Sequence, residues 1–112
     1  MKRGEIWWAD VGEPSGSEPG FRRPAVIVSA NSFNRTPINT VVVVFLTTNA
    51  ARAGNPGNVR LTKRQTGLRA DSVVNVTQLG TVDKRLLTER IGRLSETVMN
   101  QIDDGLKLVL AL

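Results

Sequence analysis

The residues that could perform chemistry in this chain are arginines, threonines and carboxylates, because its 112 residues include no Cys and no His. The absence of thiols and imidazoles excludes disulfides, cysteine nucleophiles and Ser–His pairs, and it removes the commonest metal ligand. Neither a Walker-type nor a dinucleotide-binding glycine motif occurs in the sequence. We therefore expect chemistry without a metal ion or cofactor, or binding alone.

The arginines gather in a stretch between Glu18 and Asp71 that contains no acidic residue. This stretch, the basic block, holds Arg22, Arg23, Arg35, Arg52, Arg60, Lys63, Arg64 and Arg69. The formal net charge of +5 arises there, since the two flanking parts are slightly acidic. Guanidinium groups bind phosphates in a bidentate manner, so the basic block predicts a surface that faces a polyanion, with nucleic acid as the first choice. The alternative is a solvated face whose arginines pair with acids elsewhere in the fold.

RNA cleavage suits these side chains because RNA carries its own nucleophile, the 2′-hydroxyl beside the scissile phosphate. A protein can catalyse this reaction by orienting that hydroxyl and stabilising the charge on the phosphate, and one well-placed donor contributes roughly 3–4 kcal/mol. An arginine suits the electrostatic role, and a threonine hydroxyl can donate to a phosphate oxygen. Glu18, close in sequence to the first basic pair, could accept the 2′-hydroxyl proton. Two-metal chemistry is not expected, because the basic block offers no carboxylate.

The elements that must position these groups are mostly short strands. Apolar alternation, β-branched runs and turn residues predict strands over residues 4–11, 24–30, 40–48, 58–62, 72–76, 78–82 and 90–94, with loops over 12–20 and 49–58. One helical turn is expected within 31–39, and a second from the N-cap Asp83 through Thr88. Ser95 is expected to cap a C-terminal helix whose apolar face holds Val98, Ile102, Leu106 and Val109. The pattern predicts one α+β domain over residues 1–112, mainly β, with a small barrel-like antiparallel sheet and a terminal helix.

The first strand carries two adjacent tryptophans, which must point to opposite faces. We expect Trp7 and Trp8 to serve the core and an interface, such as one with a partner subunit, rather than base stacking. No apolar run approaches the roughly 20 residues that a membrane-spanning helix needs, and no signal-peptide core follows the N-terminus. A cytoplasmic location is therefore expected.

A series of short motifs occurs in order over essentially the whole chain. They are Arg3-Gly4-Glu5-Ile6-Trp7 with Asp10, Gly16-Ser17-Glu18-x-Gly20, Arg23-Pro24-Ala25-Val26-Ile27-Val28, Asn31 with Asn34-Arg35, Leu46-Thr47-Thr48, Asp71-Ser72-Val73-Val74, Gln78, Thr81-Val82-Asp83 and Leu87-Thr88. In these motifs the chain resembles the MazF/PemK family of toxins from toxin–antitoxin modules. The resemblance implies a homodimer with an SH3-like barrel that acts as a sequence-specific, metal-independent endoribonuclease on single-stranded RNA. It also implies cleavage through the 2′-hydroxyl, with a cyclic phosphate and a 5′-hydroxyl as products, and inhibition by a small acidic antitoxin.

The resemblance also assigns site residues by position. Arg23 matches the family's catalytic arginine, Thr47 its catalytic threonine, and Glu18 an acid that is implicated in only some members. The residues expected to bind RNA are Ser17, Arg22, Arg35, Ser72 and Gln78. One branch of the family has an Arg-x-Asp pair where this chain has Asn75-Val76-Thr77, so the acid–base roles of that branch do not carry over.

Two other functions compete with this interpretation. The same fold class includes a gyrase-targeting toxin of the CcdB type, whose relatives end in Trp-Gly-Ile, whereas this sequence ends Leu110-Ala111-Leu112. The second alternative is a basic RNA-binding module without catalytic activity.

Overall fold

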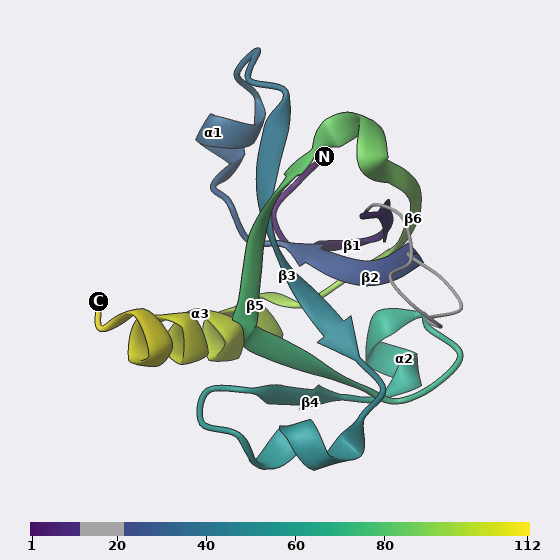
Figure 1. Cartoon of the computed structure of the whole chain (residues 1–112), viewed down its shortest axis with the longest axis vertical. Coiled ribbons are helices and arrows are strands. Elements are labelled where there is room, and N and C mark those ends of the chain that lie inside the picture. The colour runs from purple at the N-terminus through teal and green to yellow at the C-terminus, as the bar shows by residue number, and fades with distance from the viewer. Residues whose placement is uncertain (12–21) are drawn as a thin grey trace.

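The computed structural model describes residues 1–11 and 22–112, in which six antiparallel strands form one curled sheet, a half-barrel (Figure 1). The strands are β1 (Glu5–Asp10), β2 (Arg22–Ile27), β3 (Thr40–Thr47), β4 (Val59–Leu61), β5 (Ser72–Asp83) and β6 (Leu87–Arg93), in the order β4-β5-β3-β2-β1-β6. The helices are α1 (Asn31–Asn34), α2 (Lys63–Thr66) and α3 (Glu96–Leu110), and the 3-10 turns are η1 (Ala50–Gly54) and η2 (Lys84–Leu86). The predicted fold class, a small barrel-like antiparallel sheet with a C-terminal helix, is confirmed.

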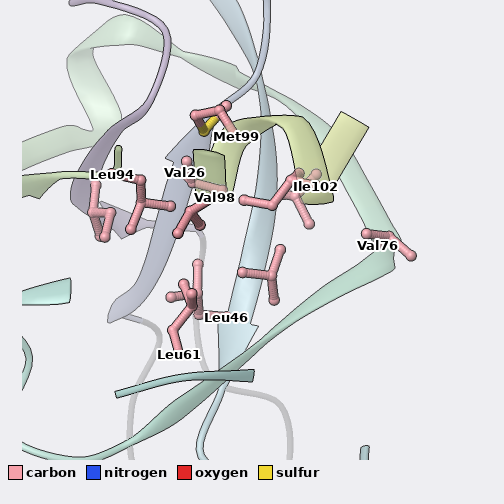
Figure 2. Packing of buried hydrophobic residues seen from close by; sticks show 11 residues of the cluster. Val26, Leu46, Leu61, Val76, Leu94, Val98, Met99 and Ile102 are labelled. Carbon is pink, nitrogen blue, oxygen red and sulfur yellow. The ribbon is translucent and has the colours of Figure 1, made fainter. Parts of the chain in front are cut away.

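The sheet is buried on both faces because its central strands carry apolar side chains at successive positions. On one face, Val44 and Leu46 of β3 join Val26 of β2 beneath α3. Figure 2 shows Val98, Met99 and Ile102 of α3 packed against this layer. On the other face, Val41 and Val43 of β3 pack with Ala25, Ile27 and Leu87. The continuous valine run therefore becomes the strand that separates two cores, as the run predicts.

Helix α3 begins where the sequence predicts, because the Ser95 hydroxyl accepts a hydrogen bond from the N–H of Val98. Val98 and Ile102 are buried as expected, and Leu106 is half-buried. The expectation for Val109 is wrong, since this residue is 37% exposed. Met99 and Gly105 complete the buried face instead. None of the helices in the described residues could span a membrane.

Several predicted boundaries need correction. The separate strands expected over 72–76 and 78–82 are one strand, β5. Its pairing with β3 moves from Val44↔Leu79 to Leu46↔Val74, so four residues of β5 face the single residue Phe45 of β3. The break expected at position 77 is thus a bulge, which interrupts pairing without ending the strand. We refer to residues 75–78 as the β5 bulge.

Other differences concern short helical turns. Asp83 caps a turn as expected, but η2 ends at Leu86 because β6 begins at Leu87 to pair with β1. The loop over 49–58 contains η1. Helix α2 was not predicted; its capping box, in which Thr62 and Gln65 exchange side-chain and backbone hydrogen bonds, stabilises a wholly polar turn.

Candidate functional site

A groove of about 900 Å³ lies where β2 begins and β3 ends. It is lined by Trp8 of β1, Arg22, Arg23 and Pro24 of β2, Leu46, Thr47 and Thr48 around the end of β3, residues 67–70 and Ser72 between α2 and β5, and Glu89, Arg90 and Ile91 of β6. Strands β2 and β3 are antiparallel, and Ala25 pairs with Phe45. If this register is continued by two residues, Arg23 lies opposite Thr47 in the neighbouring strand. The sheet order thus brings together two residues that lie far apart in the sequence.

The groove carries an excess of positive charge. Four arginines line it, Arg22, Arg23, Arg69 and Arg90, against one acidic residue, Glu89. A concave surface with one dominant sign of charge concentrates ligands of the opposite sign. The site therefore suits a polyanion with phosphate groups.

Arg23 presents a guanidinium whose charge no described carboxylate neutralises. Its Cζ lies 4.7 Å from the centroid of the Phe45 ring. Its Nη2 donates a hydrogen bond of 2.5 Å to Oε1 of Gln78. Among residues 1–11 and 22–112 it makes no ion pair, because its two partners are a ring and a neutral amide. The remaining N–H donors can serve a bound anion.

Arg22 has the opposite environment. Its Cζ lies 4.9 Å from the centroid of the Trp8 ring. Two carboxylates, one on β1 and one on β6, also lie near its guanidinium. The Nε of Arg22 is 3.9 Å from Asp10, and its Nη2 is 3.5 Å from Glu89. Arg22 lines the groove as expected for RNA binding, but part of its charge is already paired.

Thr47 offers a hydroxyl hydrogen to the groove. Its Oγ1 accepts a hydrogen bond of 3.1 Å from the N–H of Asn49, which follows the end of β3. A hydroxyl that accepts in this way still has one hydrogen to donate. The half-buried Thr47 side chain lines the groove and can therefore donate a hydrogen bond to a ligand bound there.

The other predicted RNA-binding residues are placed less uniformly. Ser72 lines the groove but is only 3% exposed, and its hydroxyl donates to the carbonyl of Ala70. Gln78 reaches the site through its hydrogen bond with Arg23. Arg35 follows α1, which lies at the opposite end of β3 from α2 (Figure 1) and is not among the residues that line the groove. Ser17 and Glu18 lie outside the described residues.

Sequence reasoning missed several groove residues. Trp7 packs against the core as expected, and Trp8, expected at the core or at an interface, lines the groove beneath Arg22. Arg90 enters the groove because β6 pairs with β1, and strand order is not readable from the sequence. Arg69 belongs to the basic block, so its charge was a usable indication.

Most residues of the basic block form no ion pair with a described carboxylate. Of its eight residues, only Arg22 forms an ion pair with a carboxylate of the described part of the chain. Within that part, the alternative of arginines paired with acids elsewhere in the fold holds for Arg22 and not for the other six arginines of the block.

Glu5 is a buried carboxylate, only 6% exposed, that contacts the groove residue Arg90. Burial raises the pKa of Glu5, but the Lys2 N–H, the Trp7 indole and the Arg90 guanidinium together hold this pKa below its ordinary value. The carboxylate lies 3.4 Å from the Nε of Arg90 and 3.1 Å from the Trp7 indole nitrogen. One buried charge thus fixes a groove arginine and a core tryptophan.

The positions of the Arg-x-Asp pair hold a neutral network in this chain. Asn75 is buried, and its Oδ1 accepts hydrogen bonds from Asn58 and Thr77.

No three His, Cys, Asp or Glu side chains within 1–11 and 22–112 gather into a group that could hold a metal ion.

A family model for PemK-like, MazF-like toxins of type II toxin–antitoxin systems matches residues 2–110. The chain belongs to this toxin family. It is 44% identical to endoribonuclease MazF6 of Mycobacterium tuberculosis, with all of this chain and 98% of the relative covered. It is 34% identical to endoribonuclease EndoA of Bacillus subtilis, with coverage of 100% and 96%.

Solved structures in this toxin family share the fold. A mycobacterial endoribonuclease in complex with its cognate antitoxin superposes with a TM-score of 0.81 at 29% identity, covering all of this chain and 96% of that one. MazF from Deinococcus radiodurans superposes with a TM-score of 0.77 at 23% identity, covering 100% and 97%. The half-barrel with its C-terminal helix is thus the fold of these toxins.

Proposed function

We propose that this chain is the toxin of a type II toxin–antitoxin system and acts as a sequence-specific, metal-independent endoribonuclease on single-stranded RNA. Membership of the toxin family over nearly the whole chain supports this function, as do the full-length relatives named endoribonucleases at 44% and 34% identity. The relatives favour the enzyme over a gyrase-binding toxin or a non-catalytic RNA-binding module. The observation that carries the proposal is the placement of Arg23 level with Thr47 at the groove.

Cleavage proceeds through the 2′-hydroxyl of the RNA. The 2′-oxygen forms a bond to phosphorus, the bond from phosphorus to the 5′-oxygen breaks, and the products are a cyclic phosphate and a 5′-hydroxyl. Arg23 stabilises the negative charge on the phosphate oxygens in the transition state, where a preorganised donor has its greatest effect. Thr47 donates its hydroxyl hydrogen to a phosphate oxygen. Glu18 is the proposed acceptor of the 2′-hydroxyl proton, and a proton from solvent or a neighbouring group reaches the leaving 5′-oxygen.

The remaining expectations belong to the same proposal. Ser17, Arg22, Arg35, Ser72 and Gln78 are proposed to contact RNA directly or to shape its path. The active form is a cytoplasmic homodimer, and its partner is an antitoxin with an acidic, extended segment. The charge of the basic block, of which only Arg22 has a carboxylate partner among the described residues, favours such a segment because it attracts RNA and an acidic peptide by the same field.

A cleavage assay in EDTA tests the activity. Wild-type protein and Arg23→Ala are incubated with mixed-sequence single-stranded RNA, and product ends are identified by mass spectrometry. We expect 5′-hydroxyl and cyclic phosphate ends with wild type, a loss of turnover of at least about 100-fold for the variant, and no cut at a site carrying one 2′-deoxy sugar. Cleavage of the 2′-deoxy site, or 5′-phosphate products, would contradict the mechanism.

A further inference from the structure

The guanidinium of Arg23 crosses a neighbouring strand to reach its hydrogen-bond partner. Arg23 starts on β2, Phe45 lies on β3, and Gln78 lies on β5, and these three strands are adjacent in the sheet. The guanidinium rests 4.7 Å from the Phe45 ring centroid and donates to Gln78 beyond that ring. One side chain is thus fixed from beneath by a π face and at its tip by an amide oxygen.

Gln78 is available for this contact because it ends the β5 bulge. The pairing of β3 and β5 leaves residues 75–78 opposite Phe45 alone, so backbone of β5 is pushed out of the regular ladder there. Bulges re-aim side chains in this way and are frequent beside active sites. In a regular strand, the side chain at position 78 would not be directed at the Arg23 guanidinium in this way.

The bulge is held by a side chain from outside the strand. Asn58 accepts a hydrogen bond of 2.9 Å from the N–H of Val76 through its Oδ1, and its amide nitrogen donates to Oδ1 of Asn75 at 3.3 Å. The same amide nitrogen donates to the carbonyl of Arg52 at 2.9 Å. The N–H of Val76 in the bulge therefore has a side-chain partner, which supports the backbone from which Gln78 extends.

Arg22, the neighbouring arginine, also stacks on a ring but has carboxylate partners, which Arg23 lacks among the described residues. The carboxylate partners of Arg22 are Asp10 and Glu89. A carboxylate beside Arg23 would offset the charge that a phosphate needs. A ring and a neutral amide restrict the guanidinium while leaving its positive charge available.

We propose that Phe45 and Gln78 are positioning residues that hold Arg23 in one orientation for the phosphate without neutralising it. This inference rests on the proposed ribonuclease function, because it assigns to the pair a share of the turnover. A guanidinium held before the RNA binds needs less ordering in the transition state, so loss of either partner lowers kcat more than it raises KM.

The first test needs no RNA. In the ¹⁵N-labelled free protein, the Arg23 Nε–Hε resonance, assigned by its disappearance in Arg23→Lys, is shifted by the ring current of Phe45. We expect this shift to vanish in Phe45→Leu and to persist in Phe45→Tyr. In Gln78→Ala, whose side chain is exposed, we expect a smaller shift and a broader line. A resonance at the position typical of free arginine in the wild type would overturn the clamp.

The second test measures steady-state cleavage of a short RNA. We expect kcat to fall about fivefold to tenfold in Phe45→Leu and in Gln78→Ala, with KM within twofold of wild type and near-full activity in Phe45→Tyr. The matched control is Phe33→Leu, since Phe33 is a half-buried ring in α1 at the other end of β3. It should keep the wild-type kcat.

The outcomes separate this inference from the function on which it rests. Wild-type kcat in both Phe45→Leu and Gln78→Ala, with wild-type protein active, overturns the positioning roles and leaves the function intact. Equal losses in Phe45→Leu and Phe45→Tyr overturn the role of the ring. If Phe45→Leu fails to fold, as judged by circular dichroism, Gln78→Ala and Phe45→Tyr still decide. If wild-type protein does not cleave RNA, the proposed function fails, and the resonance shift still decides whether the clamp exists.

Discussion

At the scale of single residues, the alternation of a strand separates two adjacent arginines by function. Successive side chains of β2 point to opposite faces, so Arg22 meets Trp8 and Asp10 while Arg23 meets Phe45. Among the described residues, carboxylates compensate the charge of Arg22 and none compensates that of Arg23. Two residues of the same type, next to each other in the sequence, therefore differ in the charge that each offers to a phosphate.

Thr47 provides a residue-scale prediction about its hydroxyl. Because Oγ1 of Thr47 accepts from the Asn49 N–H, its hydroxyl hydrogen stays available to a ligand in the groove. We expect Thr47→Val to lower kcat about 10- to 100-fold, the range for a hydrogen bond to a charged group, and Thr47→Ser to stay within a few-fold of wild type. Steady-state cleavage measures both. An active Thr47→Val variant would remove the hydroxyl from the mechanism.

Glu5 provides a prediction about pH. Its pKa is lower in the folded chain than its ordinary value of 4.5, so its charge stabilises the fold above that value. This contribution disappears as the pH falls through the lowered pKa of the folded state. We expect Glu5→Gln to be less stable than wild type at pH 7, and the difference in the free energy of unfolding to shrink at pH 3. Urea unfolding at both pH values measures it, and a constant difference would contradict the role of the charge.

At the scale of elements, the sequence predicts those whose determinants are local. Ser95 and Asp83 were identified as caps because a hydroxyl or carboxylate before a helical turn satisfies its first N–H groups. The run around Val43 marked a strand buried on both faces. These inferences need only a few neighbouring residues.

What could not be predicted depends on pairing between distant segments. The β5 bulge reads as a break between two strands unless its partner Phe45 and the supporting Asn58 are known. The groove likewise needs the strand order, since Arg90 enters it only because β6 lies beside β1. Arg23 and Thr47 were found through the resemblance, and their shared level in the sheet follows from a register that the sequence does not contain.

Gly105 shows a local rule overridden by packing between elements. Glycine within a helix costs about 1 kcal/mol relative to alanine. In α3, however, a Cβ at Gly105 would overlap the carbonyl oxygen of Gly57 and lie 3.0 Å from its carbonyl carbon. Gly57 itself has φ of +85°, which favours glycine in the turn that leads into β4. The two glycines let the turn contact the helix backbone directly.

The corresponding prediction is that Gly105→Ala destabilises the protein despite the better helix propensity of alanine. We expect a loss of about 2 kcal/mol in the free energy of unfolding, within the range for overpacking. The control is Gly54→Ala in η1, where a Cβ would meet nothing within 4 Å, and which should change stability by less than about 0.5 kcal/mol. Urea titrations of both variants provide the values. A more stable Gly105→Ala protein would show that the turn can move away from α3.

At the scale of the whole molecule, the charge is distributed unevenly over the fold. The described ion pairs involve Arg3, Arg22, Arg85 and Arg90, whereas the groove and the segment around α2 present Arg23, Lys63, Arg64 and Arg69 without a carboxylate partner among the described residues. The pairs therefore neutralise charge mainly away from the α2 side of the groove. A long anionic ligand would meet its strongest attraction on that side.

Salt dependence of RNA affinity tests this distribution. Each phosphate neutralised on a single strand contributes about −0.7 to the slope of log affinity against log salt concentration. With a 2′-deoxy substrate analogue that resists cleavage, we expect a steep slope for wild type and a slope shallower by about 0.7 for Arg69→Ala, because Arg69 lines the groove. Arg85→Ala is the matched control, since Arg85 in η2 is equally cationic and 84% exposed but pairs with Asp83 far from α2 (Figure 1). It should keep the wild-type slope. Equal effects of the two variants would mean that net charge, and not its position beside the groove, determines the affinity for RNA.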